Sequence, residues 1–524
     1  MKKISLLLSA CTVWTAALFS QASPDAVVFG NSITSGELKS YVYKLAGEEF
    51  EGRETGKMGQ KKCAEFLQDE FVQLGLPPVI ENVGYLQVFP LKEEYTGTVA
   101  MDINNVSYSF MKDFYCFNSV NDLRLDFTSL VFAGFGIKED AMRYNDYKDL
   151  DVKGKIVLIL EDEPIDKAGI SRITGTAQLS EWTSDFKKKV ELARDLGAVA
   201  LIEIAKNLSN DVEKYGHWLE KPRTMHAGEE RPDIYPVFYI SKEMASALFT
   251  SYNQKYTYDY LREQYRKKSK TFSFEFPATG KVLVERKRTQ ITGENVLGYI
   301  EGTDLKDELV IITAHYDHLG KQGDDIYYGA DDDGSGTAAI LEIAEAFALA
   351  KKAGKGPRRS ILIMPVSGEE KGLLGSEYYA ENPVFPLAET VCNLNIDMIG
   401  RMDKNHENDT NYVYIIGSDK LSSELHSANE NNNNAYTKID LDYTFNDEKD
   451  KNRFYYRSDH YNFAKNGIPV IFYFTGVHAD YHKPTDTPDK LHYGKMETIT
   501  RLVFYTAWDV ANRDKRLVVD SNKK

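Results

Sequence analysis

The sequence predicts an α/β protein in which a mostly parallel mixed sheet is flanked by helices and a smaller α/β module precedes most of that sheet. Three observations support this prediction. The 524 residues exceed what one hydrophobic core usually supports. From residue 295 onward, short apolar runs alternate with helical patterns, which is typical of parallel strands joined by helices. An upstream stretch, residues 126–275, has a similar texture but no cluster of His, Asp and Glu at ligand-like spacing.

The first 22 residues have the pattern of a secretory signal. Lys2 and Lys3 precede an apolar stretch that is too short to span a bilayer, and small residues stand at the two positions that a signal peptidase reads before a cut after Ala22. We therefore expect an exported protein, periplasmic or secreted. The alternative is a lipoprotein box that would leave a lipid anchor at Cys11. No other segment is long enough to cross a membrane.

Composition excludes some functions. The formal net charge is −15, so binding to nucleic acid would have to overcome repulsion unless a basic face were segregated, and no such face is visible. After cleavage at Ala22 three cysteines would remain, with no CxxC spacing. We expect Cys63, Cys116 and Cys392 to be buried free thiols and not disulfides or metal ligands.

The region after the signal begins with helices. Between Ser35 and Leu76 apolar residues recur at spacings of three and four, which predicts two helices. The segment between them, Phe50–Gly56, is rich in glycine and charge, and we expect a turn whose charges need only solvent. Alternating residues from 85 to 89 and from 99 to 108 predict strands.

Together with the signal of residues 1–22, these patterns divide the chain into five segments. Residues 23–125 come next, 126–275 are the smaller α/β module, 276–512 contain the main alternation of strands and helices, and 513–524 are a polar, frayed tail. Within them, residues 182–196 predict a helix and residues 255–270 a solvated amphipathic helix or linker. The asparagine-rich residues 429–434 predict an exposed loop.

The polar residues of the main domain follow its strands. In open α/β sheets the functional site lies beyond the carboxyl ends of the strands. Three aspartates in the glycine-rich stretch Gly329–Gly336 would repel one another unless they were solvated or neutralised by a cation. Other residues of ligand type also stand just after strand-like runs: His315, Asp317, Glu369, Glu370, Asp397, His478 and His482.

This set of residues predicts a metal centre. Imidazole and carboxylate ligands without thiolates suit zinc or a similar divalent ion. Five ligands exceed the three that one catalytic zinc normally keeps, which indicates two ions sharing a carboxylate, and Asp332 fits that bridging position. Asp331 and Asp333 are expected to support it. Of Glu369 and Glu370, one can bind metal while the other remains a base.

Seven blocks of the chain resemble peptidase family M28, a family of di-zinc aminopeptidases, with an inserted protease-associated (PA) domain. The blocks lie in the family's order: Phe50–Gly56, His315–Asp317, Gly329–Gly336, Ser367–Ser376, Asn395–Gly400, Ser458–Asp459 and Tyr481–Thr487. Residues 149–160 resemble the core of a PA domain. The resemblance implies a zinc-exopeptidase fold of the phosphorylase/hydrolase-like type, in which 126–275 is the PA domain and 276–512 the zinc peptidase domain.

Carried over residue by residue, the resemblance also implies the roles of the site. His315 and Asp397 would hold one zinc, Glu370 and His482 the other, and Asp332 would bridge them. Glu369 would be the general base, Asp317 would orient His315, and Tyr481 would stabilise an oxyanion. Arg457 stands where some relatives place an arginine near the substrate terminus. His478 would not be a ligand, because the Tyr-His-x-x-x-Asp-Thr block places the ligand at His482. We expect His318 and His460 to lie at the surface or beside the ligands, and not to bind metal.

The sequence therefore predicts an exported di-zinc exopeptidase that removes amino-terminal residues from peptides. Carboxypeptidase, dipeptidase and glutaminyl cyclase activities are the alternatives within the same fold. An acidic excess around the motifs favours a free amine, whereas Arg401, Arg453 and Arg457 would favour a carboxylate. The alternative from another class is a degenerate peptidase that binds peptides through its PA domain.

Overall fold

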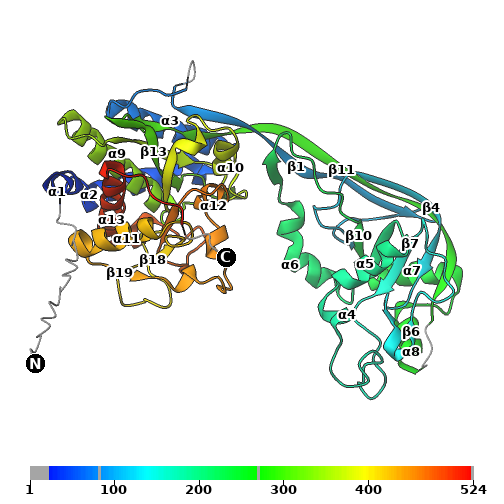
Figure 1. Cartoon of the computed structure of the whole chain (residues 1–524). Coiled ribbons are helices and arrows are strands. Elements are labelled where there is room, and N and C mark those ends of the chain that lie inside the picture. The colour runs from blue at the N-terminus through cyan, green and yellow to red at the C-terminus, as the bar shows by residue number, and fades with distance from the viewer. Residues whose placement is uncertain (1–22, 81–83, 268–271, 521–524) are drawn as a thin grey trace, which may run out of the picture. The chain divides into compact units, whose positions relative to one another are not determined.

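The computed structural model describes residues 23–80, 84–267 and 272–520. The expected signal peptide and Cys11 lie outside these residues. The chain forms two compact units, which we call the main unit, residues 1–91 and 291–524, and the inserted unit, residues 92–290 (Figure 1).

The main unit contains a seven-stranded mixed sheet in the order β12-β16-β13-β17-β20-β18-β19. The four central strands, β16, β13, β17 and β20, are parallel, whereas β12 and β18 run antiparallel to their neighbours β16 and β20. The strands are β12 Gly298–Ile300, β13 Leu305–His315, β16 Arg359–Val366, β17 Thr390–Ile396, β18 Tyr412–Ile416, β19 Asp440–Asp442 and β20 Val470–Phe474, and a separate hairpin pairs β14 Gly320–Gln322 with β15 Asp325–Tyr327. The predicted mostly parallel mixed sheet is confirmed.

Helices cover both faces of this sheet. Val310 and Ile312 of β13 pack into a core that includes α2, α3, α9 and α13, whereas Leu309 and Ile311 face the other way, into a core that includes α10 and α12. This alternation follows from the two-residue period of a strand. The helices of this unit are α1 Pro24–Gly30, α2 Ser35–Leu45, α3 Met58–Gln73, α9 Gly334–Lys352, α10 Leu374–Glu381, α11 Ser423–Asn432, α12 His460–Ala464 and α13 Tyr493–Asn512.

The inserted unit has its own sheet and its own core. The sheet follows the order β2-β1-β11-β4-β7-β8-β10-β3, with β9 paired to β1. Its strands are β1 Leu86–Ile103, β2 Val106–Tyr108, β3 Phe114–Tyr115, β4 Leu123–Phe132, β7 Ile156–Leu160, β8 Ala200–Ile204, β9 Arg223–His226, β10 Val237–Ile240 and β11 Phe274–Val296, with a small hairpin of β5 Lys138–Glu139 and β6 Tyr144–Asn145. The helices are α4 Glu181–Ser184, α5 Lys187–Asp195, α6 Leu208–Glu220, α7 Lys242–Tyr252 and α8 Tyr258–Lys267.

The expected insertion, 126–275, is shorter than the unit that forms. The chain passes between the units within the long strands β1 and β11, at residues 91/92 and 290/291. Because both strands continue without a break across these points, their alternating pattern does not mark the boundary. Similarly, the single helix expected over 182–196 is two helices, α4 and α5, separated by Asp185 and Phe186.

Two expectations about exposed segments were wrong. Asn429 is buried on α11, where its Oδ1 accepts hydrogen bonds from the hydroxyls of Tyr473 at 2.8 Å and Thr506 at 3.2 Å. Asn432 and Asn433 of the same run are also buried, and their side-chain amides donate to the carbonyls of Ala428 and Ile439. The asparagine run therefore lies partly in the core. In the expected tail, Leu517 is buried and Arg516 donates to the carbonyl of Thr390.

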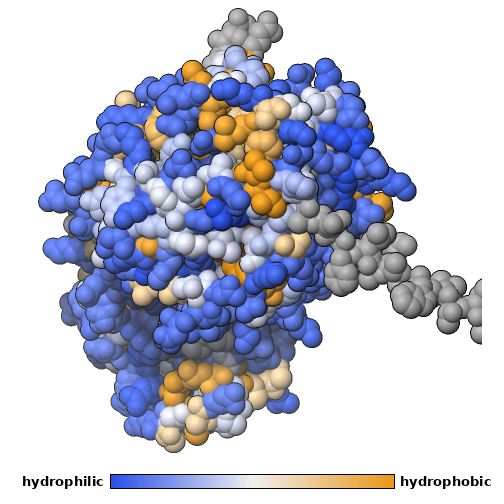
Figure 2. All heavy atoms as spheres, turned by 90° about the vertical axis from the view of Figure 1, so that its left-hand side faces the viewer, coloured by the Kyte–Doolittle hydropathy of each residue, from blue (hydrophilic) through white to orange (hydrophobic). Residues whose placement is uncertain are grey.

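The surface and the thiols agree with the composition. Figure 2 shows a face that is mostly hydrophilic, with hydrophobic residues in small separate patches. Among the described helices, none is both long and apolar enough to cross a membrane. Cys63, Cys116 and Cys392 are buried and free, as expected.

Candidate metal centre

The carboxyl ends of the central strands bring the predicted site residues together. His315 is the last residue of β13, Asp397 follows β17 directly, and Glu369 and Glu370 follow β16 by a few residues. His482 lies in the loop after β20. Since these four strands are parallel neighbours, their ends share one edge of the sheet.

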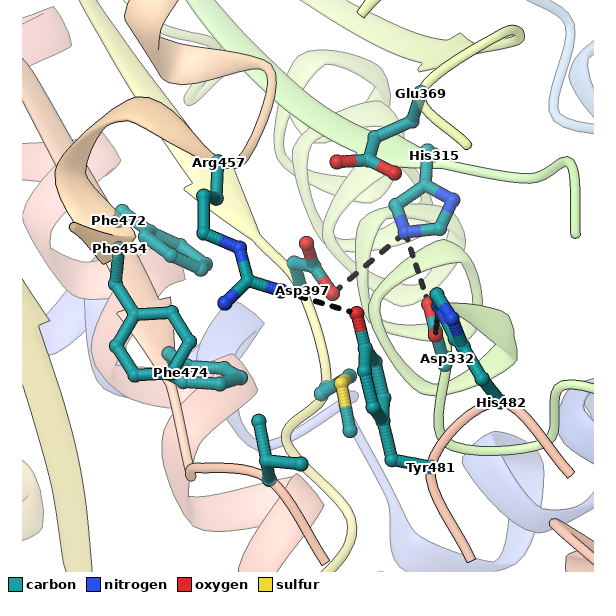
Figure 3. Close-up of a pocket in the computed structure, with 12 residues that line it drawn as sticks. His315, Asp332, Glu369, Asp397, Phe454, Arg457, Phe472, Phe474, Tyr481 and His482 are labelled. Atoms are coloured by element: carbon teal, nitrogen blue, oxygen red, sulfur yellow. Dashed lines mark hydrogen bonds and ion pairs between the residues drawn. The ribbon is translucent and has the colours of Figure 1, made fainter. Parts of the chain in front are cut away.

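One group of three side chains surrounds a point next to His315. The His315 Nε2 atom lies 3.2 Å from Asp332 Oδ1 and 3.6 Å from Asp397 Oδ1. Figure 3 shows these three side chains pointing toward one another, with the Glu369 carboxylate beside the His315 ring. The hydroxyl of Ser458 donates to Asp397 Oδ2 at 2.8 Å and so fixes the other side of that carboxylate.

A second group lies on the other side of Asp332. The His482 Nε2 atom is 3.2 Å from Asp332 Oδ2 and 3.2 Å from Glu370 Oε2. His318 lies here too, with its Nδ1 atom 2.8 Å from Glu370 Oε1 and 3.8 Å from Asp332 Oδ2. We expected His318 to lie outside the set of ligands, but it is fully buried and faces the same carboxylates. The signal that could have indicated this is its spacing of three residues from His315, on the same strand end.

Both groups have the properties of metal ligands. His315 Nε2, Asp332 Oδ2 and Glu370 Oε1 are buried and make no hydrogen bond within the described chain, and neither do the two ring nitrogens of His318. The close approach of His318 to Glu370 therefore lacks hydrogen-bond geometry. Separations of 3.2–3.6 Å suit nitrogen and oxygen atoms that each lie about 2.0–2.2 Å from a shared ion. The residues present fit divalent metal.

The electrostatics of the protein alone show that the site needs positive charge. Burial works against protonation of His482, yet Asp332 and Glu370 raise its pKa to about 10. Burial raises the pKa of Glu369 well above its ordinary value, and repulsion from Glu370 and Asp397 adds to the effect. Without a metal, the His482 imidazole therefore binds a proton. A metal ion would replace that proton, since a histidine ligand must be deprotonated to bind.

The turn before α9 is fixed from both sides. Asp333 is the N-cap of α9, where its Oδ1 accepts from the Gly336 N–H at 2.8 Å, and Asp331 Oδ1 accepts from the Gly400 N–H at 2.6 Å. Asp486 Oδ2 accepts from the backbone N–H groups of Asp331 and Asp332. Asp331 and Asp333 therefore support the turn, as expected, and Asp486 is a supporting residue that the sequence reasoning missed.

Arg53 corrects the expectation that the charges of Phe50–Gly56 are solvated. Its side chain is fully buried and donates to four backbone carbonyls on both sides of the site, those of Leu45, Tyr316, Tyr328 and Gly329, at 2.6–2.8 Å. The same segment contributes Thr55, whose hydroxyl donates to Asp317 Oδ2 at 2.6 Å. This segment therefore holds the His315 and Gly329 loops together.

Asp317 supports more than one group. The nearest acceptor to His315 Nδ1 is the backbone carbonyl of Asp317, at 3.1 Å, whereas the Asp317 carboxylate is 3.8 Å away. That carboxylate accepts from the backbone N–H of Glu369 at 3.2 Å. The main chain of Asp317 thus orients His315, and its side chain positions Glu369.

An apolar wall adjoins the acidic groups. The cavity beside His315 is also lined by Phe454, Phe472 and Phe474, and Figure 3 shows Arg457 between these rings and the acidic residues. Tyr481 stacks on the His482 ring, with the ring centroids 3.8 Å apart. Arg457 Nη2 donates to the Tyr481 hydroxyl at 3.4 Å. Burial and the nearby carboxylates raise the pKa of Tyr481 above its ordinary value, so its hydroxyl stays protonated.

The other two histidines have different surroundings. His478 Nε2 lies 3.3 Å from Asp331 Oδ2, so it contacts the supporting turn. His460 is buried against the Phe472 ring at 4.7 Å, and burial lowers its pKa to about 3. Neither belongs to the two groups of candidate ligands among the described residues.

Comparisons with known proteins identify a family for part of the chain. Residues 295–507 match the model of Peptidase family M28. A protein of Arthroderma otae named "Probable leucine aminopeptidase" is 32% identical over 214 residues, which cover 39% of this chain and 55% of that protein. A protein of Arabidopsis thaliana named "Probable glutamate carboxypeptidase" is 40% identical over 105 residues, 20% of this chain and 14% of that protein. The chain thus matches only about half of the first relative and less of the second.

A solved structure supports the fold over most of the chain. The structure of an aminopeptidase from Aneurinibacillus sp. strain AM-1 superposes with a TM-score of 0.53 at 19% identity, covering 94% of this chain and 98% of that one. At this identity the likeness concerns the fold. The matched stretch 295–507 contains both groups of candidate ligands. Residues 295–507 therefore form a peptidase family M28 domain.

Proposed function

We propose that the protein is an exported zinc exopeptidase with two metal ions, which hydrolyses the amino-terminal peptide bond of peptides. The observation that carries the proposal is the pair of ligand groups that share Asp332, one on each of its carboxylate oxygens. A single carboxylate between two sets of imidazole and carboxylate atoms suits a pair of divalent ions.

The proposed ligands are those implied by the family resemblance. His315 and Asp397 would hold one ion, Glu370 and His482 would hold the other, and Asp332 would be shared between them. His318 contacts Glu370 as closely as His482 does, so it either positions that carboxylate or joins the second ion. With Nδ1 facing a backbone carbonyl, His315 presents the lone pair of Nε2 to the centre.

The chain's own residues then complete the chemistry. Two zinc ions, when bound, supply Lewis acidity for the scissile carbonyl and the attacking water. Glu369 accepts a proton from that water and delivers it to the leaving amine. Asp317 holds Glu369 through its backbone N–H. The protonated hydroxyl of Tyr481 donates a hydrogen bond to the oxyanion that forms at the carbonyl.

The cavity favours a peptide with an apolar terminal residue. Its three phenylalanines offer apolar surface for a side chain. Its carboxylates, Asp332, Glu369 and Asp397, suit a free amine. Arg457 is the specific observation in favour of a carboxypeptidase, because it is a cation in the same cavity that could bind a terminal carboxylate.

We further propose that the inserted unit is a PA domain. Its support is the Asp-Val-x-Gly-Lys-Ile-Val pattern that leads into β7, at the centre of a separate α/β core. Export rests on the signal pattern of residues 1–22.

Blocked peptides test the direction of cleavage. One apolar tripeptide is offered in three forms: free at both ends, acetylated at the amino end, and amidated at the carboxyl end. We expect the amidated peptide to be cleaved like the free one and the acetylated peptide to resist. Cleavage of the free and the acetylated peptides, but not of the amidated one, would establish the carboxypeptidase. A separate peptide with an amino-terminal glutamine tests for the cyclase, whose product would be the cyclised terminus.

A further inference from the structure

We propose that a cavity in the inserted unit binds a cationic side chain of a peptide, independently of the metal centre. This cavity, which we call the acidic aromatic cavity, has a volume of about 280 Å³ and lies where α4 and α6 meet the β8, β10 and β3 edge of the sheet. None of its residues belongs to the main unit. The proposal therefore does not rest on the peptidase activity.

Aromatic rings form one wall of the cavity. Tyr115 of β3 and Tyr239 of β10 are register partners and stack with ring centroids 4.6 Å apart. Phe117 meets both rings edge-on, at 5.8 Å, and meets Tyr215 of α6 at 5.9 Å. The faces of such rings carry negative potential and attract cations.

Carboxylates line the rest of the cavity, and one of them is buried without a partner. Glu203 of β8 is only 8% exposed, yet its carboxylate makes no hydrogen bond or ion pair with any other described residue. Asp211 of α6, at the same cavity, makes none either within the described chain. Buried carboxylates are normally paired, so an unpaired one that lines a cavity indicates a missing cation.

Neither nearby lysine forms an ion pair with the Glu203 carboxylate. Lys189 donates to the backbone carbonyl of Asp162 and forms no ion pair with Glu203 within 4.0 Å. Lys206 pairs with the Asp162 carboxylate instead. Burial raises the pKa of Glu203 to about 7 despite the attraction of Lys189, and Glu161 and Asp211 add repulsion. Four carboxylates line the cavity against the two lysines Lys189 and Lys206, so an excess of negative charge remains.

An organic cation fits better than a metal. Both groups of residues able to hold a metal, among those the structure describes, lie in the main unit. Aromatic rings beside carboxylates suit the apolar stem and charged head of a lysine or arginine side chain.

The neighbouring surface indicates that the cation is carried by a peptide. A second cavity of about 420 Å³ shares Phe117, Phe186 and Tyr239 with the first. Apolar side chains such as Val190 and Val237 line part of the remainder, and charged side chains line the rest. A peptide can place a basic side chain in one cavity and an apolar neighbour in the other. A small amine would leave the second cavity unused.

Three doubly blocked peptides test the proposal on the full-length protein. They are acetylated, amidated tripeptides with leucine on each side of lysine, arginine or norleucine, so neither end suits an exopeptidase. Calorimetric titration should show binding of the lysine or the arginine peptide, or both, and at least about tenfold weaker binding of the norleucine peptide. Which basic peptide binds more tightly identifies the preferred cation.

Two variants locate the binding. Glu203→Gln and Asp211→Asn should each weaken binding of the basic peptide about tenfold and leave the affinity for the norleucine peptide unchanged. Glu243→Gln, at an exposed glutamate of the same unit, should change neither affinity. Asp211→Asn decides the matter if Glu203→Gln misfolds, as judged by circular dichroism. Binding should also survive a metal chelator. Equal affinity for all three peptides, no binding at millimolar concentration, or full affinity in Asp211→Asn would overturn the proposal.

Discussion

The metal centre of the main unit and the acidic aromatic cavity of the inserted unit each gather four carboxylates, but they surround them differently. In the metal centre, imidazoles converge on the carboxylates at 2.8–3.6 Å. In the cavity, rings and lysines stand around an unpaired glutamate. The comparison teaches that clustered carboxylates indicate only a need for positive charge. The companion side chains determine whether a metal ion or an organic cation meets it.

Glu369→Gln is expected to have the largest effect, because it removes a carboxylate that the proposal assigns to proton transfer and not to metal. Turnover of a free-amine peptide should fall by about a thousandfold. Metal content, measured by plasma mass spectrometry, should stay unchanged, and so should binding of basic peptides to the inserted unit. Glu381→Gln, at an exposed glutamate at the end of α10, is the matched control. Turnover that survives in Glu369→Gln would remove Glu369 from its role.

Arg53→Met should destabilise the main unit and leave the stability of the inserted unit unchanged. The variant removes four hydrogen bonds to backbone carbonyls beside the metal centre, so the main unit should lose about 3–5 kcal/mol of unfolding free energy and bind zinc more weakly. Chemical denaturation measures the loss, and peptide titration should show the inserted unit unaffected. Arg124→Met, at an exposed arginine of β4, should change stability by less than about 0.5 kcal/mol. Equal stability of the two variants would contradict the role of Arg53.

His460→Phe tests the effect of aromatic surroundings on the pKa of a histidine. Carboxylates surround His482 instead and raise its pKa. Burial lowers the pKa of His460 to about 3, so between pH 6.5 and 3 the unfolded chain takes up a proton that the folded protein does not. Stability is therefore lost as the pH falls. From pH 7 to pH 5 the variant should lose about 2 kcal/mol less than the unsubstituted protein, both measured with chelator present. Equal losses would show that His460 titrates normally.

The sequence predicted the sheet and most of the metal centre because their signals are local. Each ligand-type residue follows an apolar run, and parallel strands bring such positions to one edge. Arg53 could not be placed in the same way, since its partners, Tyr316 and Gly329, are distant in the chain and offer only backbone carbonyls. The burial of Asn429 was missed for a similar reason. Composition does not reveal that the hydroxyls of Tyr473 and Thr506 would donate to its side-chain oxygen.

The acidic aromatic cavity was invisible in the sequence. Glu203 stands in an apolar strand. Nothing in the sequence around it shows that Tyr239 of β10 and Tyr115 of β3 will stack beside it. His318 was not expected among the ligands because such a histidine more often lies at the surface or beside the ligands. Its burial against Glu370 depends on where β16 ends beside β13.

Zinc stoichiometry tests the central claim most directly. The purified protein, dialysed against buffer with zinc and then without it, should retain about two zinc ions per chain by plasma mass spectrometry. Asp332→Asn, which alters the shared carboxylate, should retain fewer than about one, while Asp307→Asn, at an exposed aspartate of β13, should retain about two. Fewer than about one ion in the unsubstituted protein, or an unchanged count in Asp332→Asn, would contradict a two-ion centre built around Asp332.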